Sequence, residues 1–249
     1  MLSKIGRLDN DAKKELAEIV QSIYKSLDNN KKAKAEKDLI KLSSTPNYFI
    51  REFVGKDLVK YADQDVIFSI SENMIKHRIY GVRATALFYF FTYYRDEPEK
   101  LIDILEESFE AVPWESESIV NDLWKRYPEL MKERMSSWVD SKNSKKRALS
   151  FHGMENIAHS DPGFIMHFIG KAIDDDTMEV QKKITHILTQ VARANPIIVF
   201  PYIREWLSEA TEKRVETIWV SMKKLANIGV QKNRRERSHE FVMFTPQTI

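Results

Sequence analysis

A tryptophan and a carboxylate stand three residues apart in the segment Trp114-Glu115-Ser116-Glu117. If a helix has begun by Trp114, residues at this spacing share one face, and the indole lies beside the Glu117 carboxylate. A fixed carboxylate stabilises positive charge that develops in a reaction, and an aromatic face attracts a cation. The same position also suits an ordinary first-turn acid that interacts favourably with the helix dipole, so both interpretations of Glu117 stay open.

Basic residues gather where several helices are predicted to begin. Repeated Lys and Arg donors bind phosphate groups, and helix N-termini add to this. We expect these residues to line one edge or groove, with the acidic runs 103–110 and 174–176 elsewhere. A solvated outer face of mixed charge is the alternative. The basic residues are Lys145, Lys146, Arg147, Lys182, Lys183, Lys213 and Arg214.

Two histidines, His152 and His186, each precede a proline by ten residues. This shared spacing indicates that they lie on one face, either pointing into a groove or filling polar gaps while partly buried. No metal site is expected, because two histidines a full repeat apart have no third ligand nearby in the sequence. The chain also has no cysteine, no phosphate-cradling glycine loop and no nucleophile elbow, so no cofactor is expected.

Helices must position these residues, because apolar side chains recur at helical spacing almost everywhere. A first stripe runs from Leu16 to Leu27, after a helix start near residues 9–11. Gly229 follows the last stripe as a natural stop. Further helices are predicted, with bounds good to about 2 to 4 residues, over 31–43, 47–62, 65–76, 79–95, 98–111, 115–126, 128–139, 143–159, 162–173, 177–194, 196–208 and 212–228.

A repeat of 34 residues organises the C-terminal half. Pro128, Pro162 and Pro196 each suit the first turn of a helix, where the missing N–H costs nothing. One helix pair cannot bury its apolar face alone, so pairs must stack. We predict at least five antiparallel HEAT-like pairs in a right-handed α-α superhelix. Three further columns keep the period, namely Met135, Ile169 and Ile203; Trp138, Ala172 and Trp206; and the dipeptides at 157–158, 191–192 and 225–226.

Tetratricopeptide repeats share this period, but they need a small residue where the present chain has Trp138 and Trp206. HEAT-like pairs are therefore the better interpretation. The segment 88–94 is aromatic on all sides, which predicts a helix buried between its neighbours. Tyr89 and Tyr93 could instead line a groove.

Composition sets the remaining limits. The chain has 43% hydrophobic and 31% charged residues, which fits a folded globular protein. No apolar stretch reaches the roughly 18 to 20 residues of a membrane span, and no signal peptide is expected. The net charge is only +2, so any nucleic-acid binding must depend on a local basic patch. We expect one helical domain over residues 1–229, a basic tail over 230–249, and a cytoplasmic location.

Several segments, in order, resemble the DNA alkylation repair family, whose HEAT-like members include bacterial alkylpurine DNA glycosylases. The match covers roughly residues 80–208, whereas the first 45 residues match poorly. The ordered succession is more specific than any single segment. The segments are 114–120 (WESESIV), 126–130 (RYPEL), 138–143 (WVDSKN), 146–148 (KRA) and 194–196 (ANP).

The resemblance implies a concave, positively charged groove that grips duplex DNA. Active family members excise N3- or N7-alkylated purines from a site with a carboxylate, two tryptophans and an arginine. By position, the carboxylate corresponds to Glu117, one tryptophan to Trp114 and the arginine to Arg147. His186 stands at the second tryptophan position. The carboxylate is usually an aspartate one residue further from its tryptophan, so the chain departs from the pattern twice.

Three functions follow from these features. The first is a DNA-binding family member that excises alkylated purines, and the second is a member that binds DNA without excision. The third is a protein-interaction scaffold, the commonest use of helical solenoids. A single basic groove favours the first two, and the placement of Glu117 separates the first from the second. No protein partner and no membrane association follow from the sequence.

Overall fold

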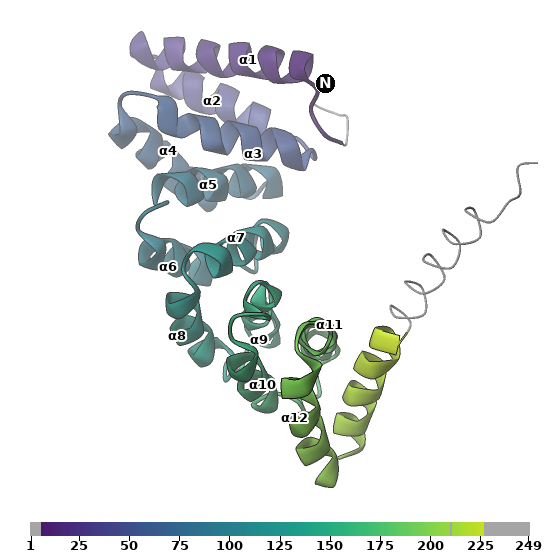
Figure 1. The fold of residues 1–249 in the computed structure, drawn as a ribbon. Helices are drawn as coiled ribbons and strands as arrows, with labels where there is room; N and C mark the ends of the chain where they lie inside the picture. The colour runs from purple at the N-terminus through teal and green to yellow at the C-terminus, as the bar shows by residue number, and fades with distance from the viewer. Residues whose placement is uncertain (1–5, 210, 227–249) are drawn as a thin grey trace, which may run out of the picture. The chain divides into compact units, whose positions relative to one another are not determined.

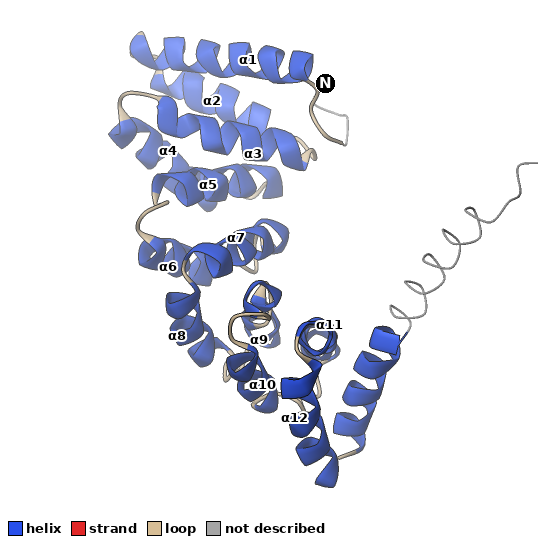
Figure 2. Cartoon of the chain, in the orientation of Figure 1, coloured by secondary structure: helices blue, strands red, loops and turns tan. Residues whose placement is uncertain are grey.

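The computed structural model describes residues 6–209 and 211–226. Across these ranges the regular structure is entirely helical, without a strand, as Figure 2 shows. The predicted all-α, HEAT-like fold class is confirmed. The expected basic tail at 230–249 and the stop at Gly229 lie outside the described residues. Most predicted helices are present within a few residues of their expected bounds.

Figure 1 labels the helices in chain order. The bounds are α1 Asn10–Asp28, α2 Lys32–Ser43, α3 Tyr48–Asp57, η1 Leu58–Lys60, α4 Gln64–Ile75, α5 Tyr80–Tyr93, α6 Pro98–Ser108, α7 Pro113–Arg126, α8 Pro128–Trp138, α9 Ser144–Ser150, η2 Met154–Ile157, α10 Pro162–Gly170, α11 Met178–Ala194 and α12 Pro196–Ser208. Residues 212–226 form a further helix.

The chain packs as two compact units, Met1–Ile119 and Val120–Ile249. In the first unit α1 packs on α2, and α3 and α4 both pack on α5. In the second, α9 packs on α8 and α11, and α10 packs on α11 and α12. Short turns join the helices into the pairs α2–α3, α4–α5, α6–α7, α8–α9 and α10–α11, followed by α12 with residues 212–226 (Figure 1). The prediction of at least five helix pairs is confirmed.

The predicted proline positions begin helices. Pro128, Pro162 and Pro196 each occupy the first turn, in α8, α10 and α12. Pro98 does the same in α6, a further copy at a different spacing that the search for a 34-residue period missed. The missing proline N–H is one that the first turn leaves unbonded in any case, so these positions favour a helix start.

The repeat columns form the core between pairs. Met135, Ile169 and Trp138 are almost fully buried, whereas Trp206 is half-buried. The predicted burial of the segment 88–94 is confirmed for Phe88, Tyr89 and Phe90, whereas residues 91, 92 and 94 are half-buried and Tyr93 is 40% exposed. The groove alternative is wrong for Tyr89, which is buried and donates a hydrogen bond from its hydroxyl to Gln64 Oε1.

One predicted helix is wrong in its length. The segment 143–159 is expected as a single helix, but α9 ends at Ser150 and a separate 3-10 turn, η2, begins at Met154. The break occurs at Gly153, whose φ of +82° lies in the left-handed region. A Cβ added there would lie 2.9 Å from the Cα of Asn121 on α7. The backbone thus approaches α7 too closely for a side chain at this break, and glycine is the residue that fits it.

A recurrent arginine secures the turn inside several pairs. It stands four residues after the N-cap of the second helix, and its Nη1 donates to the carbonyls six and five residues earlier. Arg51 donates in this way to Thr45 and Pro46, at 3.2 and 2.9 Å. Arg83 and Arg147 repeat the pattern on α5 and α9. Each arginine thus satisfies carbonyls that the turn would otherwise leave unpaired.

Candidate functional site

Helix α7 begins at Pro113, so Trp114 and Glu117 both lie within it, as the prediction of a shared face requires. Trp114 is 77% exposed and Glu117 is partly exposed. Between them, Glu115 and Ser116 are fully buried. The first turn of α7 therefore presents a large indole to solvent and directs a different carboxylate into the protein.

Glu115 is a fully buried carboxylate of the first unit. Arg51 Nη2 lies 2.7 Å from Glu115 Oε1, and both side chains are almost completely buried. The Tyr80 hydroxyl donates to the other carboxylate oxygen. Charges taken out of water need such partners, because an unpaired buried ion is strongly unfavourable. This ion pair fixes the start of α7 against α3 and α5.

Tyr80 connects three helices through its ring and its hydroxyl. The guanidinium carbons of Arg51 and Arg83 lie 5.5 and 5.8 Å from the ring centroid. Burial raises the pKa of Tyr80, and the hydrogen bond to Glu115 raises it further. The phenol therefore stays protonated and acts as a hydrogen-bond donor.

Trp114 lies at the rim of an open pocket of about 460 Å³. Arg51 and Tyr80 form part of its wall, and Gly81 contributes backbone. A Cβ on Gly81 would lie 2.4 Å from the Ser43 carbonyl oxygen, so only glycine allows α5 to begin this close to the end of α2. The complete lining is Ser44, Thr45, Pro46, Arg51, Ile79, Tyr80, Gly81 and Trp114.

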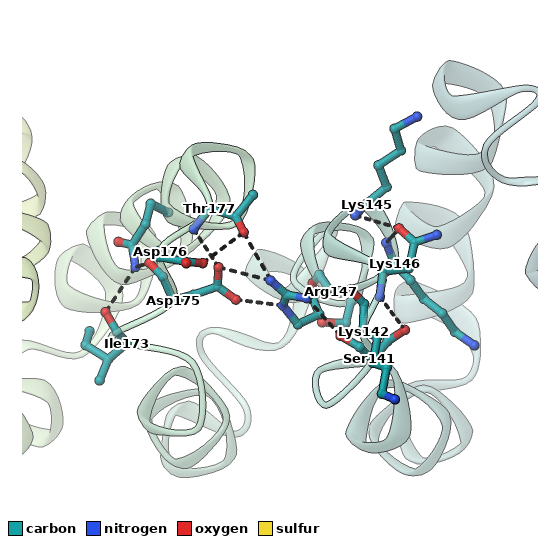
Figure 3. A network of polar contacts seen from close by, with 12 residues as sticks. Ser141, Lys142, Lys145, Lys146, Arg147, Ile173, Asp175, Asp176 and Thr177 are labelled. Carbon is teal, nitrogen blue, oxygen red and sulfur yellow. Dashed lines mark hydrogen bonds and ion pairs between the residues drawn. The ribbon is translucent and has the colours of Figure 1, made fainter.

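The second unit holds Arg147 in a closed hydrogen-bond network (Figure 3). Its Nε and Nη2 donate to the two carboxylate oxygens of Asp175, at 2.7 and 3.3 Å. Nη1 donates to the carbonyls of Ser141 and Lys142, and Nη2 donates also to Thr177 Oγ1. These contacts use all five guanidinium donors.

The pKa of Asp175 reflects this network. Burial acts to raise the pKa, but the hydrogen bonds from Arg147 and Thr177 outweigh burial, and the pKa lies below its usual value. The carboxylate stays ionised beside the guanidinium. Asp175 belongs to the turn before α11, so the pair joins two successive helix pairs.

The predicted DNA-binding lysines have different surroundings. Lys145 and Lys146 point away from the Arg147 network (Figure 3), and Lys146 Nζ lies 5.1 Å from the centroid of the Trp138 ring. Lys182 is exposed on α11. Lys183 Nζ lies 2.9 Å from His152 Nδ1. These lysines place positive charge along the starts of α9 and α11.

The predicted separation of acidic from basic residues is wrong in this unit. Arg214 Nε donates to Asp174 Oδ1 at 3.1 Å, just as Arg147 contacts Asp175. Lys213 lies 3.7 Å from Glu216. Asp174 and Asp175 thus form ion pairs with two of the predicted phosphate ligands, Arg214 and Arg147. They can do so because the turn between α10 and α11 faces the arginines of both neighbouring helix pairs.

His152 is partly buried beyond the end of α9, whereas His186 is exposed on α11. Within residues 6–209 and 211–226, no three His, Asp or Glu side chains are grouped as metal ligands. The same ranges contain no helix that is long and apolar enough to cross a membrane.

The four residues of the predicted base-contacting site are divided between the units. Trp114 and Glu117 belong to Met1–Ile119, and Arg147 and His186 belong to Val120–Ile249. The first unit brings Trp114 together with Tyr80 and the Arg51–Glu115 ion pair. Sequence analysis did not identify Tyr80 or this ion pair. Arg51 stands in the N-terminal part of the chain, where the resemblance to a family is weakest.

A family described as "DNA alkylation repair enzyme" matches residues 14–223. The chain belongs to this family. The match extends well beyond the segments recognisable by eye and includes the helices that carry Arg51 and Tyr80. No sequence match to a curated protein was found.

Two solved structures match this chain. One is the Pseudomonas fluorescens alkylpurine DNA glycosylase AlkC bound to DNA containing an abasic site analogue, with 16% sequence identity and a TM-score of 0.54. That similarity covers 84% of the present chain and 59% of AlkC, so the chain spans about three-fifths of its length. The other is an engineered protein with 14% identity and a TM-score of 0.37, over 84% of this chain and 96% of that one.

Proposed function

We propose that the protein binds duplex DNA and excises N3- or N7-alkylated purines. Family membership over residues 14–223 is the observation that carries this proposal. The exposed Trp114 supports it, since a large indole held in solvent at a pocket rim is available to a ligand. Excision breaks an N-glycosidic bond, and positive charge then develops on the sugar.

In this proposal Glu117 is the electrostatic catalyst. Its carboxylate stabilises the sugar cation and orients the attacking water, while Trp114 contacts the cationic base through its π face. Glu115 is unsuited to this role, because it is buried and already paired with Arg51 and Tyr80. His186, on α11 of the other unit, stays a prediction as the second aromatic residue, with a smaller aromatic face than tryptophan.

Arg147 remains predicted as a phosphate clamp beside the lesion. A phosphate contact would have to replace a bond to Asp175, Thr177 or a turn carbonyl, because all five donors are in use. The proposed phosphate contacts therefore depend mainly on the lysines at the starts of α9 and α11. Those lysines are Lys145, Lys146, Lys182 and Lys183.

An excision assay tests the catalytic assignment. Duplex DNA containing N7-methylguanine is incubated with the protein, and free base is measured. Glu117→Gln keeps the side-chain shape but removes its charge, so excision should fall by about a hundredfold or more while DNA affinity stays similar. Glu179→Gln, an exposed carboxylate on α11, is the matched control and should retain activity. Full excision by Glu117→Gln would contradict the assignment.

A binding assay tests the phosphate contacts. Duplex affinity should fall steeply with salt, because neutralised phosphates release counterions. The double variant Lys146→Glu/Lys183→Glu should bind all sequences more weakly, since phosphate contacts carry no base information. Lys34→Glu/Lys37→Glu makes the same charge change at exposed positions of α2. Its duplex affinity should stay closer to that of the original protein.

The departures from the family pattern, at Glu117 and His186, favour a second candidate. This is a family member that binds DNA without excising a base. Intact duplex binding with no released base would select that function. Absence of duplex affinity at low salt would instead select the protein-interaction scaffold.

A further inference from the structure

The last helix of the second unit, residues 212–226, covers a defined stripe of α11. Gln181, Thr185 and Thr189 are spaced four apart on α11, and all three are buried. Thr217 donates its hydroxyl hydrogen to Gln181 Oε1, and the Thr189 hydroxyl donates to the Ser221 carbonyl at 3.3 Å. This stripe is therefore the surface of α11 on which the second helix of the next pair packs.

The last helix repeats this stripe, but leaves it in solvent. A shift of 34 residues takes Gln181 to Val215 and Thr185 to Trp219. Val215 is 46% exposed and Trp219 is 65% exposed, whereas the two α11 residues are each only 6% exposed. Two of the three polar residues on the covered stripe thus correspond to apolar residues on the open one, and the third, Thr189, corresponds to the exposed Lys223.

Helix α12 shows the same pattern. The same shift takes the buried Met166 and Ile173 to Phe200 and Leu207, which are 49% and 44% exposed. We call Phe200, Leu207, Val215 and Trp219 the end face. Apolar side chains of this size at positions that earlier repeats bury mark a surface that is normally covered.

We propose that residues 230–244 of the same chain cover the end face. This segment, VQKNRRERSHEFVMF, has a basic first part and the apolar cluster Phe241-Val242-Met243-Phe244 after it. The end face has matching chemistry, since exposed carboxylates accompany its apolar residues on the same two helices and in the turn after α12. They are Glu205, Glu209, Glu212 and Glu216.

The connection is long enough for this arrangement. Residues 227–240 can span about 45 Å when extended, at roughly 3.3 Å per residue. The last described helix has 15 residues and is about 22 Å long at 1.5 Å per residue. The segment is therefore long enough to reach every part of this helix. The inference does not depend on DNA binding.

Cross-linking tests the proposal directly, because the chain has no cysteine. Val215→Cys/Phe244→Cys introduces the only two thiols into the full chain. A flexible bis-maleimide should give an intramolecular product with the mass of one chain. Glu133→Cys/Phe244→Cys is the matched control, with the first thiol on an exposed position of α8 in the same unit, and should give little of this product. A two-chain product would show that a second copy covers the end face and would overturn the proposal.

Trp219 provides an independent readout. Its contribution is obtained by comparing acrylamide quenching of the full chain with that of Trp219→Phe. In the original protein Trp219 should be shielded from quenching, and Phe241→Asp/Phe244→Asp should increase its quenching and shift its emission to longer wavelength. Circular dichroism checks that this variant is folded. Equal Trp219 quenching in both proteins would overturn the proposal.

A charge-reversal variant tests the carboxylates beside the end face. Glu212→Lys/Glu216→Lys should also increase the quenching of Trp219, because it places like charge opposite the basic residues 232–237. High salt should reproduce part of this effect in the original protein. Unchanged quenching in the variant, with cross-linking intact, would contradict a contribution of charge to this contact. The apolar residues alone would then hold the segment on the end face.

Discussion

At the scale of single residues, the two glutamates of Trp114-Glu115-Ser116-Glu117 have opposite surroundings. Glu115 is buried against Arg51, while Glu117 is partly exposed. The helical period shows that neighbours two apart point in different directions, but not which one points inward. That choice depends on Arg51, which is 64 residues away in the sequence. The fold of α7 could be predicted locally, and its buried ion pair could not.

The first prediction compares these glutamates by stability. Glu115→Gln leaves the Arg51 guanidinium buried without its counter-charge and should lower the free energy of unfolding by about 3 to 5 kcal/mol. Glu117→Gln should change it by no more than about 0.5 kcal/mol, as surface substitutions usually do. Urea titration of both variants provides the measurement. Equal losses would show that the buried pair is not what holds the start of α7.

At the scale of elements, the prolines and apolar columns predicted most helix starts, whereas the end of α9 was missed. A single glycine in a helical pattern does not by itself indicate a break. The break at Gly153 depends on contact with Asn121 and Trp124 of α7, which local sequence does not show. Likewise, Arg147 looked like a phosphate ligand because its carbonyl partners in the turn are backbone atoms, which carry no sequence signal.

The second prediction concerns this break. Gly153→Ala should lower the free energy of unfolding by at least about 1 to 2 kcal/mol, because an L-residue is strained at positive φ and its Cβ would meet the Asn121 Cα at 2.9 Å. Gly163→Ala is the matched control on α10, where the nearest atom to an added Cβ is 3.9 Å away. It should be neutral or stabilising by up to about 1 kcal/mol. Similar losses for both variants would contradict the close approach.

At the scale of the whole molecule, family membership and the all-α fold agree with the predictions from the repeat. The charge pattern of the second unit does not, because its acidic turn pairs with arginines of the neighbouring helix pairs. Asp174 pairs with Arg214, and Asp175 with Arg147. Each pair crosses from one helix pair to the next. Ionic contacts between successive repeats therefore add to the apolar columns in holding the stack together.

The last prediction follows from the sign of these pKa changes. The Arg214 hydrogen bond lowers the pKa of Asp174, and the pKa of Asp175 is also below its usual value, despite burial, through Arg147 and Thr177. Unfolded aspartates titrate near about 3.9. A carboxyl group with a lower pKa in the folded state stabilises the fold above about pH 4, and this stabilisation disappears as the pH falls through the folded-state value.

The stability of the original protein should therefore fall more steeply between about pH 5 and pH 2 than that of Asp174→Asn/Asp175→Asn. That variant should also be less stable at pH 7, where the carboxylate charges are missing. Thermal unfolding followed by circular dichroism across this range makes the comparison, with Asp140→Asn, an exposed residue of the α8–α9 turn, as the control. Parallel pH profiles for the original protein and the double variant would show that the inter-repeat ion pairs contribute nothing to the stability of the second unit.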